Sequence, residues 1–145
     1  RKNYTLLGDS VNLAARLEGV TKEFHLTMLV SENTYELVKE KFIAREIDLL
    51  RVKGKLQPVK VYEVMADLEV GLTEEQQQVF DHYTAGLEAY CQRRWEEALA
   101  CFGRALMVDP DNPDGPSLTY RDRCRDYQEA PPPQDWDGVY VMTKK

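Results

Sequence analysis

The sequence predicts an α+β protein in which an α/β segment precedes a small all-α segment. Over residues 1–66, short β-prone apolar runs alternate with runs of helical periodicity. After Thr73 the composition changes to Glu, Gln, Ala and Leu at helical spacing, and a hydrophobic content of 43% is typical of a globular protein. We therefore expect four parts, at residues 1–66, 67–72 (a linker), 73–130 (helical) and 131–145 (a Pro/Trp tail).

The first part is predicted to run in the order strand, helix, strand, helix, strand, strand. Gly8 ends the first strand, while Asp9 or Ser10 and later Ser31 offer oxygens that cap the two helices. The expected strands are 4–7, 25–30, 44–52 and 59–66, and the expected helices are 11–24 and 32–42. Apolar side chains of the second helix, from Tyr35, Leu37, Val38 and Phe42, should cover the sheet. So short a segment buries a poor core alone, and we therefore expect half of a domain.

The helical part contains one repeat unit, at residues 79–112. Its side chains resemble the 34-residue tetratricopeptide pattern at Gly86, Tyr90, Trp95, Ala98, Phe102, Ala105 and Pro110. The small residues should lie where two antiparallel helices touch, the aromatic ones should fill the contact, and Pro110 should stop the second helix. A helix at 117–128 is expected to cap the unit with Arg and Asp on its outer face, and Trp136 of the tail is expected to pack back on the helices.

Composition excludes several classes of function. A net charge of −6 and a pI near 5.0 argue against nucleic-acid binding. Three cysteines without C-x-x-C spacing favour reduced thiols over disulfides or a zinc site. No run approaches the roughly 20 apolar residues of a membrane span, so we expect a soluble, cytoplasmic segment. Because the chain opens on a strand without an initiator Met, we expect a piece of a longer protein.

Asn12 and Arg16 are four residues apart and should share one helix face. A guanidinium forms forked bonds to phosphoryl oxygens, and an amide can hold a sugar. The spacing alone leaves another interpretation open, in which Asn12 bonds a neighbouring loop and Arg16 pairs with an exposed Glu.

Residues 4–18, Tyr-Thr-Leu-Leu-Gly-Asp-Ser-Val-Asn-Leu-Ala-Ala-Arg-Leu-Glu, resemble the signature of class III adenylate and guanylate cyclases. Val52-Lys53-Gly54-Lys55, followed by Val61-Tyr62-Glu63-Val64, resembles the closing hairpin of the same family. The resemblance covers residues 1–66 and implies the C-terminal half of a ferredoxin-like cyclase domain, an α/β sandwich.

The resemblance also implies roles for single residues. Asn12 would contact the ribose, and Arg16 would stabilise the charge that grows at the α-phosphorus. Lys53, or in its place Lys55, would hold the terminal phosphates. Thr5 would read adenine, which points to ATP as the substrate. As alternatives, Thr5 is an ordinary strand residue and the Lys-Gly-Lys sequence a solvated turn.

The resemblance implies further components that this chain lacks. Mg²⁺ or Mn²⁺ would be held by two aspartates upstream of Arg1, where a base-reading lysine is also expected, and Asp9 is better explained as a helix-start carboxylate. Two cyclase domains would pair as a homodimer, and the product would be cyclic AMP. This chain alone should be inactive. Similar bacterial cyclases suggest a bacterial parent, which a preceding segment could anchor in the membrane.

An interaction module is the alternative function. In that case the first part is a degenerate, non-catalytic cyclase remnant, and the helical repeat binds a peptide or a neighbouring domain. The two hypotheses differ in whether the residues before Arg1 supply the aspartates and the lysine.

Overall fold

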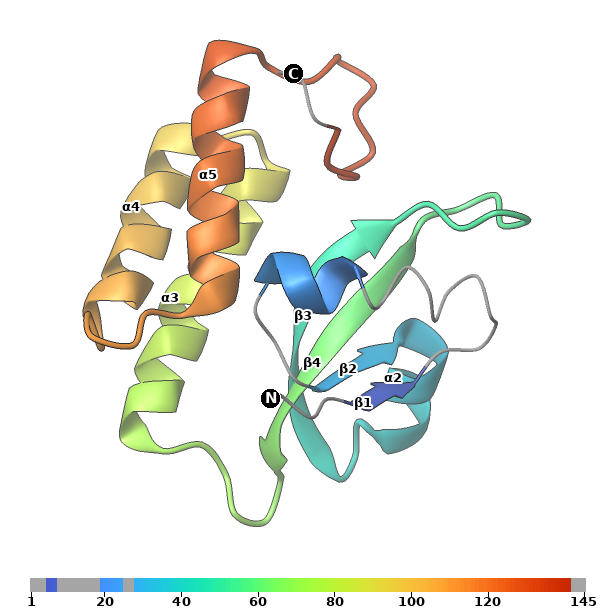
Figure 1. The fold of residues 1–145 in the computed structure, drawn as a ribbon, viewed down its shortest axis with the longest axis vertical. Helices are drawn as coiled ribbons and strands as arrows, with labels where there is room; N and C mark the ends of the chain where they lie inside the picture. Colours follow the sequence, from blue (N-terminus) through green and yellow to red (C-terminus); the bar gives the residue numbers. More distant parts are fainter. Residues whose placement is uncertain (1–4, 8–18, 25–27, 142–145) are drawn as a thin grey trace. The chain divides into compact units, whose positions relative to one another are not determined.

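The computed structural model describes residues 5–7, 19–24 and 28–141. The chain forms two compact units, Arg1–Leu72 and Thr73–Lys145, which are described separately below (Figure 1). Within the described residues, none of the helices is both long enough and apolar enough to cross a membrane.

The first unit is built on a four-stranded sheet with the strand order β1-β2-β4-β3. The strands are β1 (Thr5–Leu7), β2 (Met28–Ser31), β3 (Phe42–Leu50) and β4 (Val59–Asp67). β1 runs parallel to β2, and β4 is antiparallel to both of its neighbours, β2 and β3. Residues 19–24 are helical and lie in the crossover that a parallel pair requires. The predicted α+β class is confirmed: a sheet with three antiparallel strands, β2, β4 and β3, precedes the helices of the second unit.

The core of the first unit includes side chains of the sheet and of the 19–24 helix. Phe24, Leu29, Ile47 and Val61 are all 0% exposed. Ile47 is the extra residue of a β-bulge, because Glu46 pairs with Tyr62 and Asp48 with Val61. The bulge allows Ile47 and Asp48, which are consecutive, both to be buried.

Helix α2 (Glu32–Val38) is shorter than predicted. Ser31 caps it as expected, since its Oγ accepts a hydrogen bond from the Thr34 amide at 3.2 Å. The predicted end at Phe42 is wrong, because Phe42 opens β3 and pairs with Asp67. The predicted apolar stripe is also wrong: Leu37 is 85% exposed. The ring of Tyr35 stacks on Tyr62 instead, at 3.9 Å between centroids.

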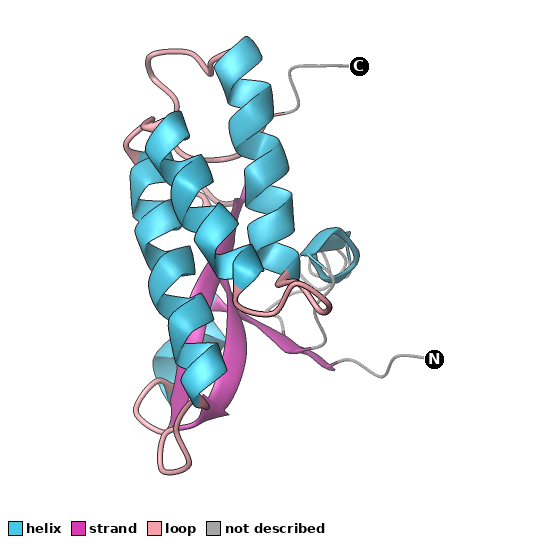
Figure 2. Ribbon diagram, turned by 90° about the vertical axis from the view of Figure 1, so that its left-hand side faces the viewer, coloured by secondary structure: helices cyan, strands magenta, loops and turns pink. Residues whose placement is uncertain are grey.

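The second unit consists of helices α3 (Glu74–Cys91), α4 (Trp95–Met107) and α5 (Gly115–Glu129), which lie alongside one another (Figure 2). α3 begins with a capping box, in which Thr73 and Gln76 bond each other's backbone amides. The capping helix is present as α5. Its basic residues do not all face outward as predicted: Arg123 is 4% exposed, because its guanidinium lies over the rings of Tyr120 and Tyr140.

The contact between α3 and α4 follows the repeat pattern. Phe102 and Ala98 are 0% exposed, and a Cβ atom added to Gly86 would lie 2.7 Å from Cε1 of Phe102. This distance is shorter than any van der Waals contact, so only glycine fits beside the ring. The predicted role of Gly86 as a point of close approach is confirmed.

Candidate functional site

The cyclase-like residues fall partly within the described structure. Asn12 and Arg16 lie outside the described residues, as do Asp9 and Ser10. Thr5 begins β1, where its backbone is in register with Met28 of β2. Lys53 and Lys55 lie in the loop that joins β3 to β4.

The β3–β4 loop, residues 51–58, presents several cations. Lys53 and Lys55 are exposed, and Gly54 between them has a φ of 88°, in the left-handed region that favours glycine. The Lys55 amide donates to the Val52 carbonyl at 3.1 Å, which closes the turn. Residues 51–58 line a hollow of about 280 Å³. A second hollow, of about 480 Å³, lies between residues 54–59 and the start of α2 at Glu32 and Asn33.

The loop is held at its base by contacts of the flanking strands. The Glu32 carboxylate accepts a hydrogen bond from the Lys60 amide at 2.9 Å, which ties the start of α2 to β4. Val52 is 7% exposed and anchors the loop on the core. Exposed lysine ammonium groups on such an anchored loop could bind phosphate oxygens as point charges.

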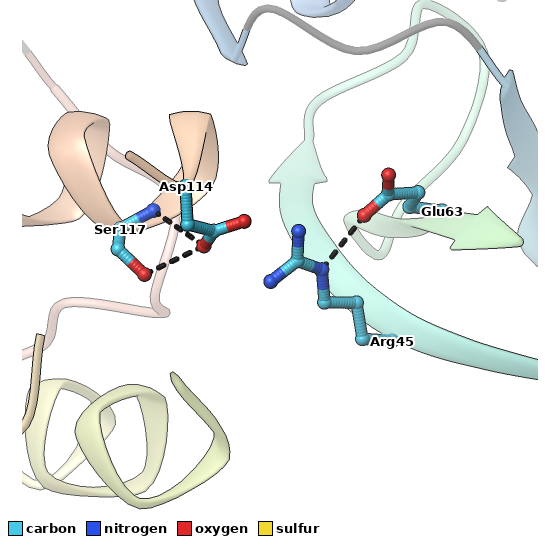
Figure 3. A network of polar contacts seen from close by, with 4 residues as sticks. All are labelled: Arg45, Glu63, Asp114 and Ser117. Atoms are coloured by element: carbon cyan, nitrogen blue, oxygen red, sulfur yellow. Dashed lines mark hydrogen bonds and ion pairs between the residues drawn. The ribbon is translucent and has the colours of Figure 1, made fainter. Parts of the chain in front are cut away.

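Arg45 and Glu63 form an ion pair across β3 and β4 (Figure 3). The Arg45 Nε lies 2.7 Å from the Glu63 carboxylate, and the two side chains are 4% and 18% exposed. The sequence alone does not single out this pair, because a charged residue in a strand is usually solvated. Its burial makes it a structural element of the sheet.

The other polar group drawn in Figure 3 belongs to the second unit and caps α5. Asp114 accepts hydrogen bonds from the Ser117 amide at 3.2 Å and from the Ser117 hydroxyl at 2.6 Å. This is ordinary N-cap geometry and explains why α5 begins at Gly115.

The described residues do not fit a metal site. Among them, no three His, Cys, Asp or Glu side chains come together in a group that could hold an ion.

A second candidate site lies in the helical unit, where Tyr90, Trp95 and Tyr127 surround the indole of Trp136; we call these three residues the aromatic slot. The ring centroids of Tyr90, Trp95 and Tyr127 lie 5.4, 5.7 and 5.3 Å from that of Trp136. Tyr90 and Tyr127 meet the indole edge to face, at 79° and 76°. The predicted packing of Trp136 on the helices is confirmed.

Arg93 is a site residue that the sequence does not reveal. Its Nη1 and Nη2 donate to the carbonyls of Pro133 and Pro132, at 2.8 and 2.7 Å. Arg93 lies between α3 and α4 with a φ of 64°, uncommon for a residue other than glycine. No sequence signal identifies it, because arginine has no preference for this conformation.

Burial controls the ionisation of several groups in the described residues. Burial of the Cys124 thiol raises its pKa to about 12. Burial, followed by the Glu46 carboxylate, raises the pKa of Tyr62 to about 12. Burial and the Asp126 carboxylate, which accepts a 2.6 Å hydrogen bond from the Tyr140 hydroxyl, raise the pKa of Tyr140. These groups are neutral near pH 7.

The chain resembles known proteins in two respects. The tetratricopeptide repeat model matches residues 79–112. The chain is 33% identical over 127 residues, 86% of its length, to a terminal-differentiation-specific adenylate cyclase of Dictyostelium discoideum. It is 39% identical over 69 residues (46% of the chain) to an adenylate cyclase of Anabaena cylindrica, and 34% identical over 65 residues (45%) to adenylate cyclase 1 of Rhizobium meliloti (strain 1021). No solved structure matches.

The chain covers only a small part of these relatives, 6%, 14% and 10% of their respective lengths. The 127-residue match is longer than the first unit, Arg1–Leu72, so it extends into the helical unit. The chain is thus homologous to adenylate cyclases over part of its length and carries a tetratricopeptide repeat at residues 79–112.

Proposed function

We propose that the chain is the C-terminal part of a class III adenylate cyclase catalytic domain, followed by a helical interaction unit, and that its parent protein converts ATP to 3′,5′-cyclic AMP and pyrophosphate. The observation that carries the proposal is the match to an adenylate cyclase over 86% of the chain. A generic helical repeat would account for a match in the second unit only.

The fold of the first unit supports the proposal. A parallel strand pair with a helical crossover is followed by an antiparallel hairpin, β3–β4, whose loop carries Lys53 and Lys55. This is the order expected for the second half of an α/β cyclase sandwich. A four-stranded sheet of this size needs a larger domain to complete its core.

The proposed chemistry assigns each candidate residue one task. Arg16 stabilises the negative charge that develops on the α-phosphate when the ribose 3′-oxygen attacks, and Asn12 orients the ribose. Lys53 neutralises the terminal phosphates that leave as pyrophosphate. Thr5, on β1, reads the adenine. By the resemblance to class III cyclases, we propose that the ligands for Mg²⁺ or Mn²⁺ come from the preceding part of the catalytic domain, in a homodimer of such domains.

The test is a substrate comparison with the longer protein that contains this chain. With manganese present, we expect cyclic AMP from ATP and at least about tenfold less cyclic GMP from GTP, as a base-reading contact normally discriminates by that much or more. The isolated 145-residue chain should form neither product. Turnover by the isolated chain, or equal turnover of both nucleotides, would contradict the assignment.

The tetratricopeptide match at residues 79–112 favours a second function, as an interaction module. If the longer protein were inactive with both nucleotides but retained a partner that binds the helical unit, the first unit would be a cyclase remnant. The two functions can also coexist, with the helical unit regulating the cyclase.

A further inference from the structure

We propose that the segment 131–141 is an intramolecular ligand of the helical unit, and that the site it occupies is a recognition site for an extended peptide bearing two adjacent prolines and a tryptophan. The site consists of the aromatic slot (Tyr90, Trp95 and Tyr127) together with Arg93. This inference concerns only the second unit and does not rest on the cyclase assignment.

The contacts of the segment are those of a recognised peptide. The Arg93 guanidinium holds the carbonyls of two consecutive residues, Pro132 and Pro133, which an extended proline pair presents without needing backbone donors. Three residues later the indole of Trp136 enters the aromatic slot. Arginine and large aromatic side chains are the types that dominate peptide and protein recognition.

The segment also carries its own internal order. The Trp136 amide donates to the Pro133 carbonyl at 3.1 Å, and the Trp136 indole donates to the Val139 carbonyl at 2.7 Å. The Val139 amide donates to Asp137 at 3.1 Å. A peptide that forms its turn by itself loses little conformational entropy on binding.

Side chains of the helical unit make the hydrogen bonds that join the segment to the helices. These bonds run from Arg93 to Pro132 and Pro133, from Tyr140 to Asp126, and from the Val141 amide to the Tyr127 hydroxyl at 3.1 Å. None of these four bonds is a backbone bond between residues of the helices. This feature distinguishes a bound ligand from a strand or helix that belongs to the fold.

Departure of the segment would expose a large aromatic surface. Tyr90 and Tyr127 are 1% and 0% exposed with the segment in place. Contiguous exposed apolar patches on monomeric proteins usually mark interaction sites, so we expect the uncovered aromatic slot to bind a ligand. A partner must then compete with the chain's own tail, and the chemistry of that tail, Pro-Pro-x-x-Trp, defines the partner.

The test uses the full chain and a synthetic peptide of residues 130–141. In the Trp136→Ala chain the intramolecular ligand lacks its anchor. We expect this chain to bind the labelled peptide at least about tenfold more tightly than the unmutated chain does. The reason is that the tethered ligand of the unmutated chain competes with the peptide at an effective concentration of about 1 mM. The same peptide carrying Trp136→Ala should bind about 30-fold more weakly, as expected for loss of a buried aromatic anchor.

Two further variants separate recognition from folding. Arg93→Asn removes the guanidinium but keeps a residue that tolerates positive φ. Introduced into the Trp136→Ala chain, this substitution should weaken peptide binding about tenfold. Arg125→Asn, at an exposed position of α5, should leave binding unchanged. Circular dichroism reports whether each variant retains its helices.

Hydrogen exchange in the unmutated chain provides an independent test. If the segment is a ligand, the Val139 and Val141 amides exchange by local release, at least about 100-fold faster than the interior amides of α3. Exchange of all these amides at one common rate would overturn the proposal, because the segment would then be an integral part of the fold. Absence of peptide binding to a folded Trp136→Ala chain, or loss of its helices even with peptide added, would overturn it too.

Discussion

Gly86 illustrates how one residue fixes the distance between two helices. An added Cβ would lie 2.7 to 2.9 Å from three atoms of the Phe102 ring, which is itself 0% exposed and stacked on Tyr120 at 5.5 Å. The ring has no free direction in which to move. We expect Gly86→Ala to lower the free energy of unfolding of the helical unit by about 1 to 2 kcal/mol, because overpacking outweighs the gain in helix propensity.

Gly103 provides the matched control. It also lies inside a helix, α4, but an added Cβ there meets nothing within 4 Å. Gly103→Ala should therefore raise the free energy of unfolding by about 0.5 to 1 kcal/mol. Urea unfolding followed by tryptophan emission measures both variants, since Trp95 and Trp136 both lie in the second unit. Equal effects of the two substitutions would contradict the packing described here.

The Arg45–Glu63 pair leads us to expect different effects on stability when Glu63 and the nearby Glu46 are each replaced. Glu63→Ala leaves the buried Arg45 guanidinium without this partner and should destabilise the first unit by about 2 to 4 kcal/mol. Glu46→Ala removes an exposed pair, with Lys60 at 3.1 Å, and should cost less than about 1 kcal/mol. Hydrogen exchange of the β3 and β4 amides measures both, and a larger loss for Glu46→Ala would show that the buried pair is not structural.

Because of the buried Cys124 thiol, we expect the free energy of unfolding to depend on pH above neutrality. In the folded chain its thiol keeps the proton up to a pKa of about 12, whereas the unfolded thiol loses it near the ordinary value of 9.0. Above pH 9 the unfolded state binds fewer protons than the folded state, so stability is fully present below pH 9 and falls by on the order of 1 kcal/mol per pH unit as the pH rises toward the folded pKa.

The Cys124→Ala variant should lose this dependence between pH 9 and pH 10, whatever its stability at pH 7. Cys91→Ala is the control, because Cys91 is exposed. Urea unfolding at pH 8, 9 and 10 makes the comparison. An unchanged slope for Cys124→Ala would show that the thiol is not the group responsible.

At the scale of single residues, the sequence predicts those positions whose role follows from size. Gly86 and Phe102 are predictable because a small residue or a large aromatic one has few places in a helical repeat. Arg93 and Arg123 cannot be found in this way. Both act through long-range contacts, with residues 132–133 and with Tyr140, that no local pattern encodes. Asn12 and Arg16 remain predictions, since they lie outside the described residues.

Among the secondary-structure elements, order is easier to predict than boundaries. α2 ends at Val38 because the chain must turn to start β3 at Phe42, opposite Asp67. Pairing across the sheet therefore overrides a helical pattern that continues to Phe42. β3 also ends at Leu50, two residues before the predicted end, because the turn containing Gly54 begins earlier than its sequence suggests.

The β3–β4 loop allows Lys53 and Lys55 to be distinguished. If Lys53 holds the terminal phosphates, Lys53→Ala in the longer protein should lower kcat/KM for ATP about tenfold or more, because a hydrogen bond to a charged group is lost. Lys55→Ala, two residues away on the same exposed loop, should change it by less than about threefold. The reverse result would assign the phosphate contact to Lys55, and no effect of either would make the loop a solvated turn.

The whole chain combines a unit built on a sheet with a unit built of helices. The first unit carries a four-stranded sheet, and the helical unit follows its tetratricopeptide repeat with α5 and the tail. The match to an adenylate cyclase extends over both. Sequences similar to both units therefore occur in one chain in that relative.

The most direct test of the cyclase assignment is the rate of cyclic AMP formation by the longer protein carrying Arg16→Ala, compared with Lys22→Ala. Lys22 is exposed on the 19–24 helix and serves as the matched loss of one positive charge. We predict that Arg16→Ala lowers kcat by about 100-fold or more, since a group that stabilises transition-state charge is lost, and that Lys22→Ala stays within about twofold. If Arg16→Ala retained turnover within about threefold of the unmutated protein, this chain would not supply the catalytic arginine, and the interaction function would be its main one.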